Sequence, residues 1–85
     1  MSNILVVVGS ITSASRLVKR LTKSGDRIAQ LISTPAQLGG SGCSYSVRAS
    51  LYSEQFIRNN LQGITIKKIY IEEVIRGERY YHDIS

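Results

Sequence analysis

Hydrophobic residues follow two different patterns along the first third of the chain. Residues 4–8 are all aliphatic, and an unbroken apolar run of this length is typical of a strand buried on both faces. After Gly9, apolar residues recur at intervals of three or four. This spacing predicts a helix that is capped by Ser10 or Thr12 and ends near Gly25. The apolar stripe of this helix consists of Ala14, Leu17, Val18 and Leu21.

The patterns farther along the chain predict three more strands and a second helix. Residues 27–33 are rich in aliphatic side chains, and residues 45–49 alternate between apolar and polar, so both segments are expected to be strands. A weaker apolar stripe predicts a helix over residues 52–62. Apolar residues change face within the last predicted strand, 64–71, which requires either a bulge near Lys67-Lys68 or a later start.

The resulting element order, β-α-β-β-α-β, is that of the ferredoxin-like α+β sandwich, an antiparallel sheet with both helices on one face. We expect a single domain over residues 1–85, with a core at about 3–71 and a loosely ordered C-terminal tail at 72–85. Because the first strand is apolar on both sides, something must cover the face without helices. Self-association into a homo-oligomer is the preferred interpretation, and folding back of the tail is the alternative.

Composition limits the classes of protein to which this chain can belong. No segment has the roughly 18 apolar residues of a membrane helix, and the first residues do not form a signal peptide, so a cytoplasmic protein is expected. The single cysteine excludes an internal disulfide framework and a cysteine-only metal site, and the distant His82 does not complete one. The sequence therefore predicts no metal and no cofactor.

The net charge of +5 suggests an acidic partner. Four basic residues share the side of the first predicted helix that lies opposite the apolar stripe. We interpret them as either a solvated surface or a docking surface for an acidic protein. These residues are Arg16, Lys19, Arg20 and Lys23. RNA-recognition domains share the predicted element order, but they need aromatic residues on the first and third strands, where this chain has only Tyr45. The sequence thus argues against nucleic acid as the partner.

The segment from Ser33 to Ala49 contains the most distinctive local signals. Thr34-Pro35-Ala36-Gln37 has the form of a capping box, in which the Thr34 hydroxyl accepts from the Gln37 N–H and the Gln37 side chain reaches back. Gly39 is then expected to end this helical turn in the left-handed conformation. A glycine-rich loop follows and leads to the only cysteine, at the start of the third strand. The loop consists of Gly40, Ser41, Gly42, Cys43 and Ser44.

Cys43 is the main candidate for chemistry. In the simplest interpretation it is a small buried hydrophobic residue without reactivity. The neighbouring glycines favour a second interpretation, because they allow successive backbone N–H groups to converge on an anion and stabilise a thiolate or persulfide. Nothing in the spacing pairs Cys43 with His82 as nucleophile and base. The loop also lacks the glycine pattern and the following helix of a nucleotide-binding motif.

The segment 33–43, within a short β-α-β-β-α-β chain, resembles the selenium/sulfur carrier protein-like family of small bacterial proteins. The resemblance extends over about residues 4–70. It depends mainly on the Thr-Pro turn, the following leucine, the Ser/Gly-rich loop and the single cysteine. It implies that Cys43 carries sulfur or selenium. The family commonly has glycine directly after the cysteine, whereas this chain has Ser44, whose side chain alters the anion environment of the thiol.

The resemblance and the single thiol together imply a carrier without catalytic turnover of its own, because one cysteine cannot resolve a persulfide within its own chain. The expected partners are proteins: a donor of the cysteine desulfurase type and an acceptor. The residues expected to position Cys43 are Thr34, Pro35, Gly39, Gly40, Ser41, Gly42 and Ser44. The alternative is a regulatory or protein-interaction module in which Cys43 is inert.

Overall fold

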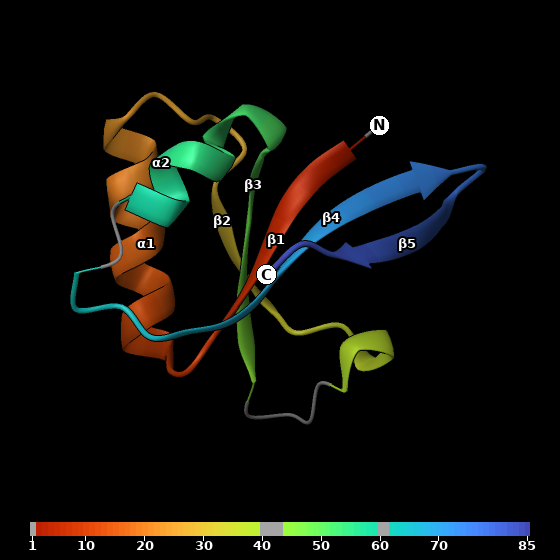
Figure 1. Cartoon of the computed structure of the whole chain (residues 1–85), viewed down its shortest axis with the longest axis horizontal. Helices are drawn as coiled ribbons and strands as arrows, with labels where there is room; N and C mark the ends of the chain where they lie inside the picture. Colours follow the sequence, from red (N-terminus) through yellow and green to blue (C-terminus); the bar gives the residue numbers. More distant parts are fainter. Residues whose placement is uncertain (1, 40–43, 60–61) are drawn as a thin grey trace.

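A computed structural model describes residues 2–39, 44–59 and 62–85 of the chain. The described residues form an α+β fold, with a five-stranded antiparallel sheet and two α-helices (Figure 1). The strands lie in the order β2-β3-β1-β4-β5. They are β1 (Ser2–Val8), β2 (Gln30–Ser33), β3 (Tyr45–Ser50), β4 (Ile66–Ile75) and β5 (Glu78–Asp83), and the helices are α1 (Ile11–Lys23) and α2 (Glu54–Asn59).

The aliphatic run at the start of the chain forms β1, the central strand of the sheet. Its residues from Asn3 to Val8 are all buried, which confirms the prediction of a strand covered on both faces. Helix α1 is capped by Ser10, whose side chain accepts a hydrogen bond from the Ser13 N–H at 3.1 Å. Both helices lie on the same side of the sheet (Figure 1). The core between helices and sheet includes Ile4, Val6, Val8, Ala14, Leu17, Leu21, Val47, Ala49 and Ile57.

The change of face within the last predicted strand is a bulge in β4. Val7 pairs with Lys68, whereas Val8 pairs with Ile66, so Lys67 is the extra residue. The strand also starts at Ile66, later than the apolar pattern does. Both explanations offered by the sequence are therefore present. The bulge allows the apolar residues before and after it to face the same core.

β2 begins three residues later than predicted, because a buried aspartate holds the preceding residues in a turn. Asp26 is 3% exposed and accepts hydrogen bonds from the N–H groups of Ile28 and Ala29. The same carboxylate accepts from the N–H and hydroxyl of Ser50 and from the hydroxyl of Ser53, at distances of 2.9, 3.0 and 2.6 Å. Burial raises the pKa of Asp26, but these hydrogen bonds outweigh burial, and the net pKa is lowered.

The second predicted helix begins later than expected. A 3-10 helix, Leu51–Ser53, leads into α2, whose described residues are Glu54–Asn59. Ile57 is buried in the core and Phe56 packs against it, which confirms the apolar side of this helix. Residues 60 and 61 lie outside the described residues, and Gly63, just after the predicted helix, has a positive φ of 75°.

Residues 72–85, predicted as a loosely ordered tail, instead extend β4 and form β5. A turn at Arg76 and Gly77, both with positive φ, connects the two strands, which pair antiparallel along their length. β5 is made of charged, tyrosine and histidine residues and has no aliphatic side chain, so no hydrophobic pattern marks it as a strand. The sheet therefore has a fifth strand beyond the four of the predicted ferredoxin-like sandwich.

The face of the sheet without helices is covered by the chain itself. Leu5 and Val7 point to this face, because they alternate with the helix-side residues of β1, and they are only 0% and 8% exposed. Arg48 of β3 and Glu72 of β4 lie on either side of β1 and form a bidentate salt bridge. Its Nε–Oε1 and Nη2–Oε2 distances are 2.8 and 3.1 Å. A bridge between these strands has to pass over β1, so it covers part of that strand.

The carboxylate of Glu72 is buried and also accepts a hydrogen bond from the Tyr81 hydroxyl of β5 at 2.9 Å. Burial raises the pKa of Glu72, but the hydrogen bonds from Arg48 and Tyr81, together with the charge of Arg48, outweigh burial and lower the net pKa. Glu73 pairs with His82 at 3.3 Å on the other side of the sheet. The two adjacent glutamates therefore lie on opposite faces, as the alternation of side chains along a strand requires.

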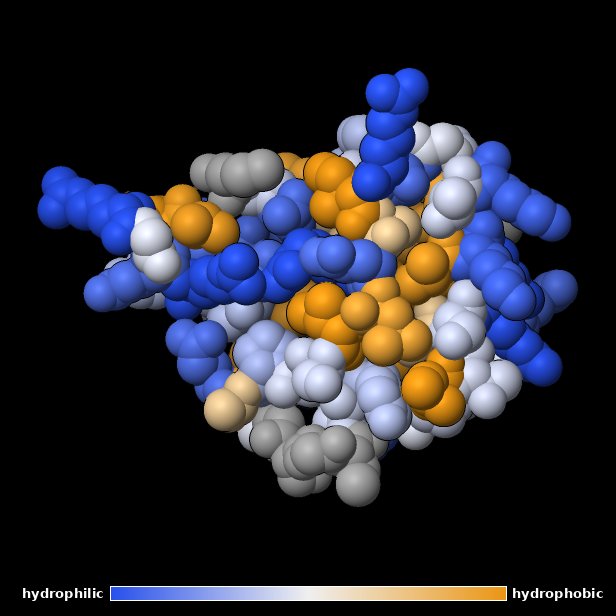
Figure 2. Space-filling model, turned by 180° about the vertical axis from the view of Figure 1, so that it is seen from behind, coloured by the Kyte–Doolittle hydropathy of each residue, from blue (hydrophilic) through white to orange (hydrophobic). Residues whose placement is uncertain are grey.

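Figure 2 shows the back of the molecule, where hydrophobic side chains lie on either side of a hydrophilic band. The sequence offered two covers for the sheet face without helices. The C-terminal segment does not fold back over this face, because it pairs with β4 as the edge strand β5; the side chains of Arg48, Glu72 and Tyr81, from three strands, lie over the face instead. Self-association stays a prediction, and burial of Leu5 and Val7 no longer requires it.

Candidate functional site

The segment that connects β2 to β3 contains the cysteine loop. The two ends of this segment, Thr34 and Ser44, are bonded to each other. The Thr34 N–H donates to the Ser44 carbonyl oxygen at 3.0 Å, next to the last β2–β3 pair, Ser33↔Tyr45. The Ser44 hydroxyl donates to the Thr34 hydroxyl at 2.8 Å. Backbone and side-chain hydrogen bonds thus close the loop at the end of the β2–β3 hairpin.

Thr34 does not cap a helix, so the predicted capping box is wrong. The next residues form a 3-10 helix, Ala36–Leu38, with Pro35 at its N-cap position and no side-chain cap. The Thr34 and Ser46 hydroxyls instead share a hydrogen bond of 2.8 Å, and the Gln37 side chain donates to a carbonyl oxygen of β5 at 3.3 Å. Thr34 is buried beside the strands, where a hydroxyl without a partner is costly, and this favours the strand contacts over the cap.

Three hydroxyls, those of Thr34, Ser44 and Ser46, form a cluster at the base of the loop. We refer to them as the hydroxyl cluster. Ser46 is 0% exposed, and each hydroxyl bonds to another member of the cluster. Ser46 was not among the site residues predicted from the sequence. The available signal was its position in β3, where alternation with Val47 places a serine next to the buried strand β1.

Gly39 adopts the left-handed conformation, with φ of 78°, as predicted for the residue that ends the turn. A Cβ atom at this residue would meet nothing within 4 Å, so the backbone angle, and not lack of space, is what favours glycine. The remaining loop residues assigned from the sequence lie outside the described residues, and their roles stay predictions. They are Gly40, Ser41, Gly42 and Cys43.

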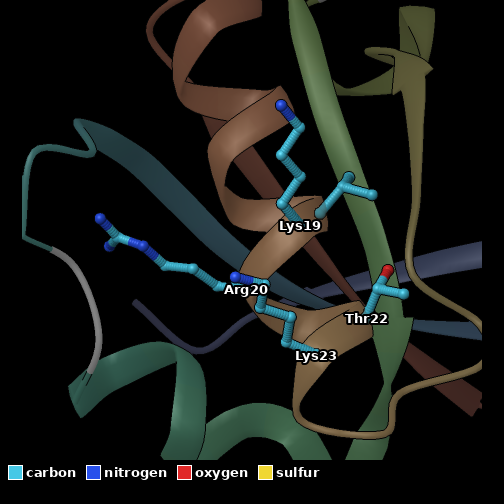
Figure 3. A pocket seen from close by; sticks show the side chains of 5 residues that line it. Lys19, Arg20, Thr22 and Lys23 are labelled. Atoms are coloured by element: carbon cyan, nitrogen blue, oxygen red, sulfur yellow. The ribbon is translucent and has the colours of Figure 1, made fainter.

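Two of the four basic residues on α1 bind backbone carbonyl groups. Arg16 Nη1 donates to the Gly63 carbonyl oxygen at 3.3 Å, and Arg20 Nη2 donates to the Gln62 carbonyl oxygen at 2.7 Å. Figure 3 shows that Arg20 points to one side of α1 and Thr22 to the other. The two arginines therefore attach α1 to the segment before β4, a structural role that the sequence did not indicate.

Lys19 and Lys23 have different surroundings from the two arginines. With Val18, Arg20 and Thr22 they line a shallow hollow of about 360 Å³ on the outer surface of α1 (Figure 3). Within the part of the chain that the structure describes, no carboxylate pairs with either lysine. Docking of an acidic partner stays a prediction, and these two lysines are the members of the basic set that are available for it.

Other candidate sites are not supported by the described residues. Residues 2–39, 44–59 and 62–85 contain no group of three or more His, Cys, Asp and Glu side chains that could hold a metal ion. His82 is an exposed residue of β5 that contacts Glu73. Among the described helices, none is long and apolar enough to cross a membrane.

Comparison with known proteins identifies a family that covers most of the chain. A family model described as “Putative Se/S carrier protein-like” matches residues 3–76. No curated protein and no solved structure matches the chain. The matched range contains the complete cysteine loop and the strands on either side of it, and it ends before β5.

Proposed function

Because this chain belongs to the Se/S carrier protein-like family, we propose that Cys43 carries sulfur or selenium between partner proteins. The cargo is held as a persulfide or a perselenide. The observation that supports the proposal most directly is the family match over residues 3–76, since this range contains the only cysteine. The partners are a donor protein that forms a persulfide itself, such as a cysteine desulfurase, and an acceptor protein.

Loading of sulfur onto Cys43 requires no oxidant. The Cys43 thiolate attacks the outer sulfur of the donor's persulfide, and a new S–S bond forms while the bond between the donor's two sulfur atoms breaks. The donor cysteine leaves as a thiolate, so charge and atoms balance and the number of S–S bonds is unchanged. Unloading is the same step with Cys43 as the leaving thiolate and the acceptor's thiolate as the nucleophile.

The base of the loop supports this role. Ser44 follows Cys43 directly, and both its carbonyl oxygen and its hydroxyl are bonded to Thr34. The chain therefore leaves the cysteine segment at Ser44, which Thr34 holds at the end of the β2–β3 hairpin. A carrier has to present one thiol to two partners in turn, and an anchored loop suits this requirement.

We also infer that the protein has no catalytic turnover of its own and acts in the cytoplasm. A single thiol forms no disulfide within its chain, so release of the cargo depends on a partner's thiol. A reducing compartment keeps a lone thiol available for this exchange.

Mass spectrometry after incubation with a cysteine desulfurase and cysteine tests the proposal. We expect the mass of one sulfur atom to be added at Cys43 and to be removed by a thiol reductant. Cys43→Ser is the matched control, and it should fold normally and gain no sulfur.

The alternative function is an interaction module in which Cys43 is inert. It predicts that Cys43 in the folded protein resists both alkylation near neutral pH and loading by the desulfurase. That result would exclude the carrier function. Rapid alkylation together with sulfur loading would exclude the inert module.

A further inference from the structure

The net charge of the protein belongs to one part of the fold. Residues 1–50 contain six basic residues and one acidic residue, whereas residues 51–85 contain five of each, so the first half carries the whole net charge of +5. Its one acidic residue, Asp26, is buried, and its basic Arg48 pairs with a glutamate of β4. The other five basic residues all lie within residues 16–27, on α1 and the turn that follows it.

Helix α1 presents two of these cations to solvent on the side away from the sheet. Lys19 and Lys23 each follow a buried leucine of α1 by two residues, which is about 200° around a helix, so they lie opposite the stripe that packs on the sheet. In Figure 3, Arg20 and Thr22 point to opposite sides of α1, and the two lysines lie between them. α1 contains no acidic residue, and no ion pair of the described residues involves either lysine. The outer surface of α1 is therefore basic and has no counter-charge from the described segments.

The hollow on this surface distinguishes between classes of acidic partner. Val18 and the basic side chains line it, its volume is about 360 Å³, and its lining is mainly apolar. Long basic side chains contribute aliphatic stems to such a surface while their charged ends stay in water. The phosphates of a nucleic acid would pair with the lysines but leave the apolar hollow unfilled. An apolar side chain with acidic neighbours matches both features, which favours an acidic protein.

The spacing of the two lysines matches side chains on a second helix that lies alongside α1. Lys19 and Lys23 are four residues apart, which is about 6 Å along the helix axis. Acidic residues four apart on the second helix have the same axial interval and share one face, so each can meet one lysine. An apolar residue three positions after the first acidic residue lies on that face too, beside the hollow.

From these features we propose that the outer surface of α1 is a docking surface for an acidic amphipathic helix of a partner protein. The helix lies along α1, places two carboxylates near Lys19 and Lys23, and inserts an apolar side chain beside Val18. Attraction between these exposed charges makes the binding salt-sensitive. The inference goes beyond the proposed function: a carrier needs protein partners, but the surface does not include Cys43 and does not depend on the cargo.

A second copy of the chain is a poor match for this surface. All six acidic residues lie in the described segments, and each carboxylate already has a hydrogen-bond or ion-pair partner in its own chain. They are Asp26, Glu54, Glu72, Glu73, Glu78 and Asp83. A second copy would therefore have to give up internal contacts to pair with the lysines, and its net charge of +5 would oppose the approach.

NMR titration of the full chain with a defined peptide tests the surface directly. The probe is an alanine-rich helical peptide with two glutamates four residues apart and a leucine on the same face, and lysines replace the glutamates in the control peptide. We expect amide signals of residues 18–23 to shift with the acidic peptide only, and less at high salt. No shift at millimolar peptide, equal shifts with both peptides, or larger shifts on β5 than on α1 would overturn the proposal.

Two further titrations test the other occupants. Binding of a single-stranded RNA oligonucleotide to α1 should be weaker than binding of the acidic peptide, and the reverse order would overturn the choice of a protein partner. The amide signals of residues 18–23 should not change when the protein alone is diluted. A change on dilution would show that a second copy covers α1, and it would overturn the proposal.

Matched variants locate the binding energy. Lys19→Gln/Lys23→Gln should weaken peptide binding about tenfold, as expected for the loss of two exposed ion pairs. Lys67→Gln/Arg76→Gln makes an equal change in net charge at two exposed residues of β4 and its turn, and it should have little effect. Equal weakening by both double variants would show a general charge effect and would overturn the site. Replacing the leucine of the peptide with serine should also weaken binding, and unchanged affinity would overturn the use of the hollow.

Failure of this inference is distinguishable from failure of the proposed function. Cys43→Ser lacks the thiol but keeps the α1 surface, so it should bind the acidic peptide as tightly as the unmodified protein does. Loss of binding in Cys43→Ser would overturn the assignment to α1. If sulfur is loaded onto Cys43 but the peptide does not bind, the carrier function stands and the docking surface is overturned. If the peptide binds but no sulfur is loaded, the docking surface stands and the carrier function fails.

Discussion

The carboxylate of Asp26 joins segments that are far apart in the sequence, and its replacement tests how much that connection contributes to stability. Asp26 accepts hydrogen bonds from the turn at residues 28–29 and from Ser50 and Ser53. Asp26→Asn keeps the shape but turns an NH2 group toward donors. Hydrogen bonds to a buried charged group contribute about 1.5–3 kcal/mol each, so we expect the free energy of unfolding to fall by about 3 kcal/mol in urea denaturation.

Glu54→Gln is the control for Asp26→Asn, because it also neutralises one carboxylate. Glu54 pairs with Arg58 at 3.0 Å on the surface of α2, and both side chains are partly exposed. Exposed pairs of this kind contribute only about 0.3–0.5 kcal/mol. Similar losses in the two variants would show that Asp26 does not hold the β2 turn to β3.

The buried carboxylates also determine how stability depends on pH. The pKa values of Asp26 and Glu72 are lower in the folded protein than their ordinary values of 3.8 and 4.5. The unfolded chain therefore binds protons more readily, and stability rises with pH through the acid range. We expect the urea midpoint to be constant above about pH 6 and to fall as the pH decreases through the two ordinary values toward the lower, folded ones.

The double variant Asp26→Asn/Glu72→Gln should show a much flatter acid dependence than the unmodified protein. Hydrogen bonds from Lys68 and Ser85 also lower the pKa of the exposed Asp83, to about 2. High salt weakens the Lys68–Asp83 attraction, because salt screens exposed charges, so the acid dependence measured at high salt contains less of the Asp83 contribution. An acid dependence that is unchanged in the double variant would contradict the assignment to Asp26 and Glu72.

Hydrophobic patterning cannot identify buried polar residues such as Asp26 and Glu72, or the partly buried Arg48 that pairs with Glu72. In the sequence, Asp26 follows a glycine at the end of a helix, and Arg48 and Glu72 stand at polar positions of strands, where exposure is the ordinary expectation. Their burial depends on partners 24 residues away in the chain. These pairs form only once the strand register is set.

Among the secondary-structure elements, the β2–β3 hairpin holds the cysteine loop, and two variants of Ser44 test its contribution. Ser44→Ala removes the hydroxyl that donates to Thr34, and we expect a loss of about 1 kcal/mol in the free energy of unfolding. Ser44→Gly removes the same hydroxyl and adds backbone freedom, which should cost about 0.5–1 kcal/mol more. Urea denaturation of the two variants separates the hydroxyl contribution from the backbone contribution.

The same two variants connect the loop base to the thiol. Ser44→Gly restores the glycine that is usual in the family, and we expect Cys43 to be alkylated as fast as in the unmodified protein, or faster. The comparison is made in native buffer with an iodoacetamide probe. Slower alkylation in Ser44→Gly than in Ser44→Ala would contradict this expectation.

Most elements could be predicted because their hydrophobic periods are clear. The apolar stripe of α1, the aliphatic run of β1 and the change of face in β4 were all recognisable in the sequence. β5 was missed because strand pairing, and not burial of aliphatic side chains, holds it in place. The candidate loop was located by its glycines and cysteine, but its closing bonds depend on the register that places Thr34 opposite Ser44.

For the molecule as a whole, the Arg48–Glu72 pair, in which Glu72 is buried and Arg48 partly buried, occupies the sheet face that self-association was predicted to cover. Removing one member of a buried ion pair leaves an uncompensated charge and typically costs about 3–5 kcal/mol. Replacing both members with apolar residues of similar volume is often neutral. The pair thus need not be a net source of stability, and its other effect is to keep this face polar.

We therefore predict different outcomes for the single and double replacements of this pair. Arg48→Met alone should lower the free energy of unfolding by about 3 kcal/mol, because Glu72 is then buried without its cation, and Arg48→Met/Glu72→Met should recover most of that loss. The double variant should also associate more strongly than the unmodified protein, since the two side chains that lie over Leu5 become apolar. Urea denaturation and light scattering over a dilution series measure both effects. Additive losses, or an association state equal to that of the unmodified protein, would show that the pair does not control this face.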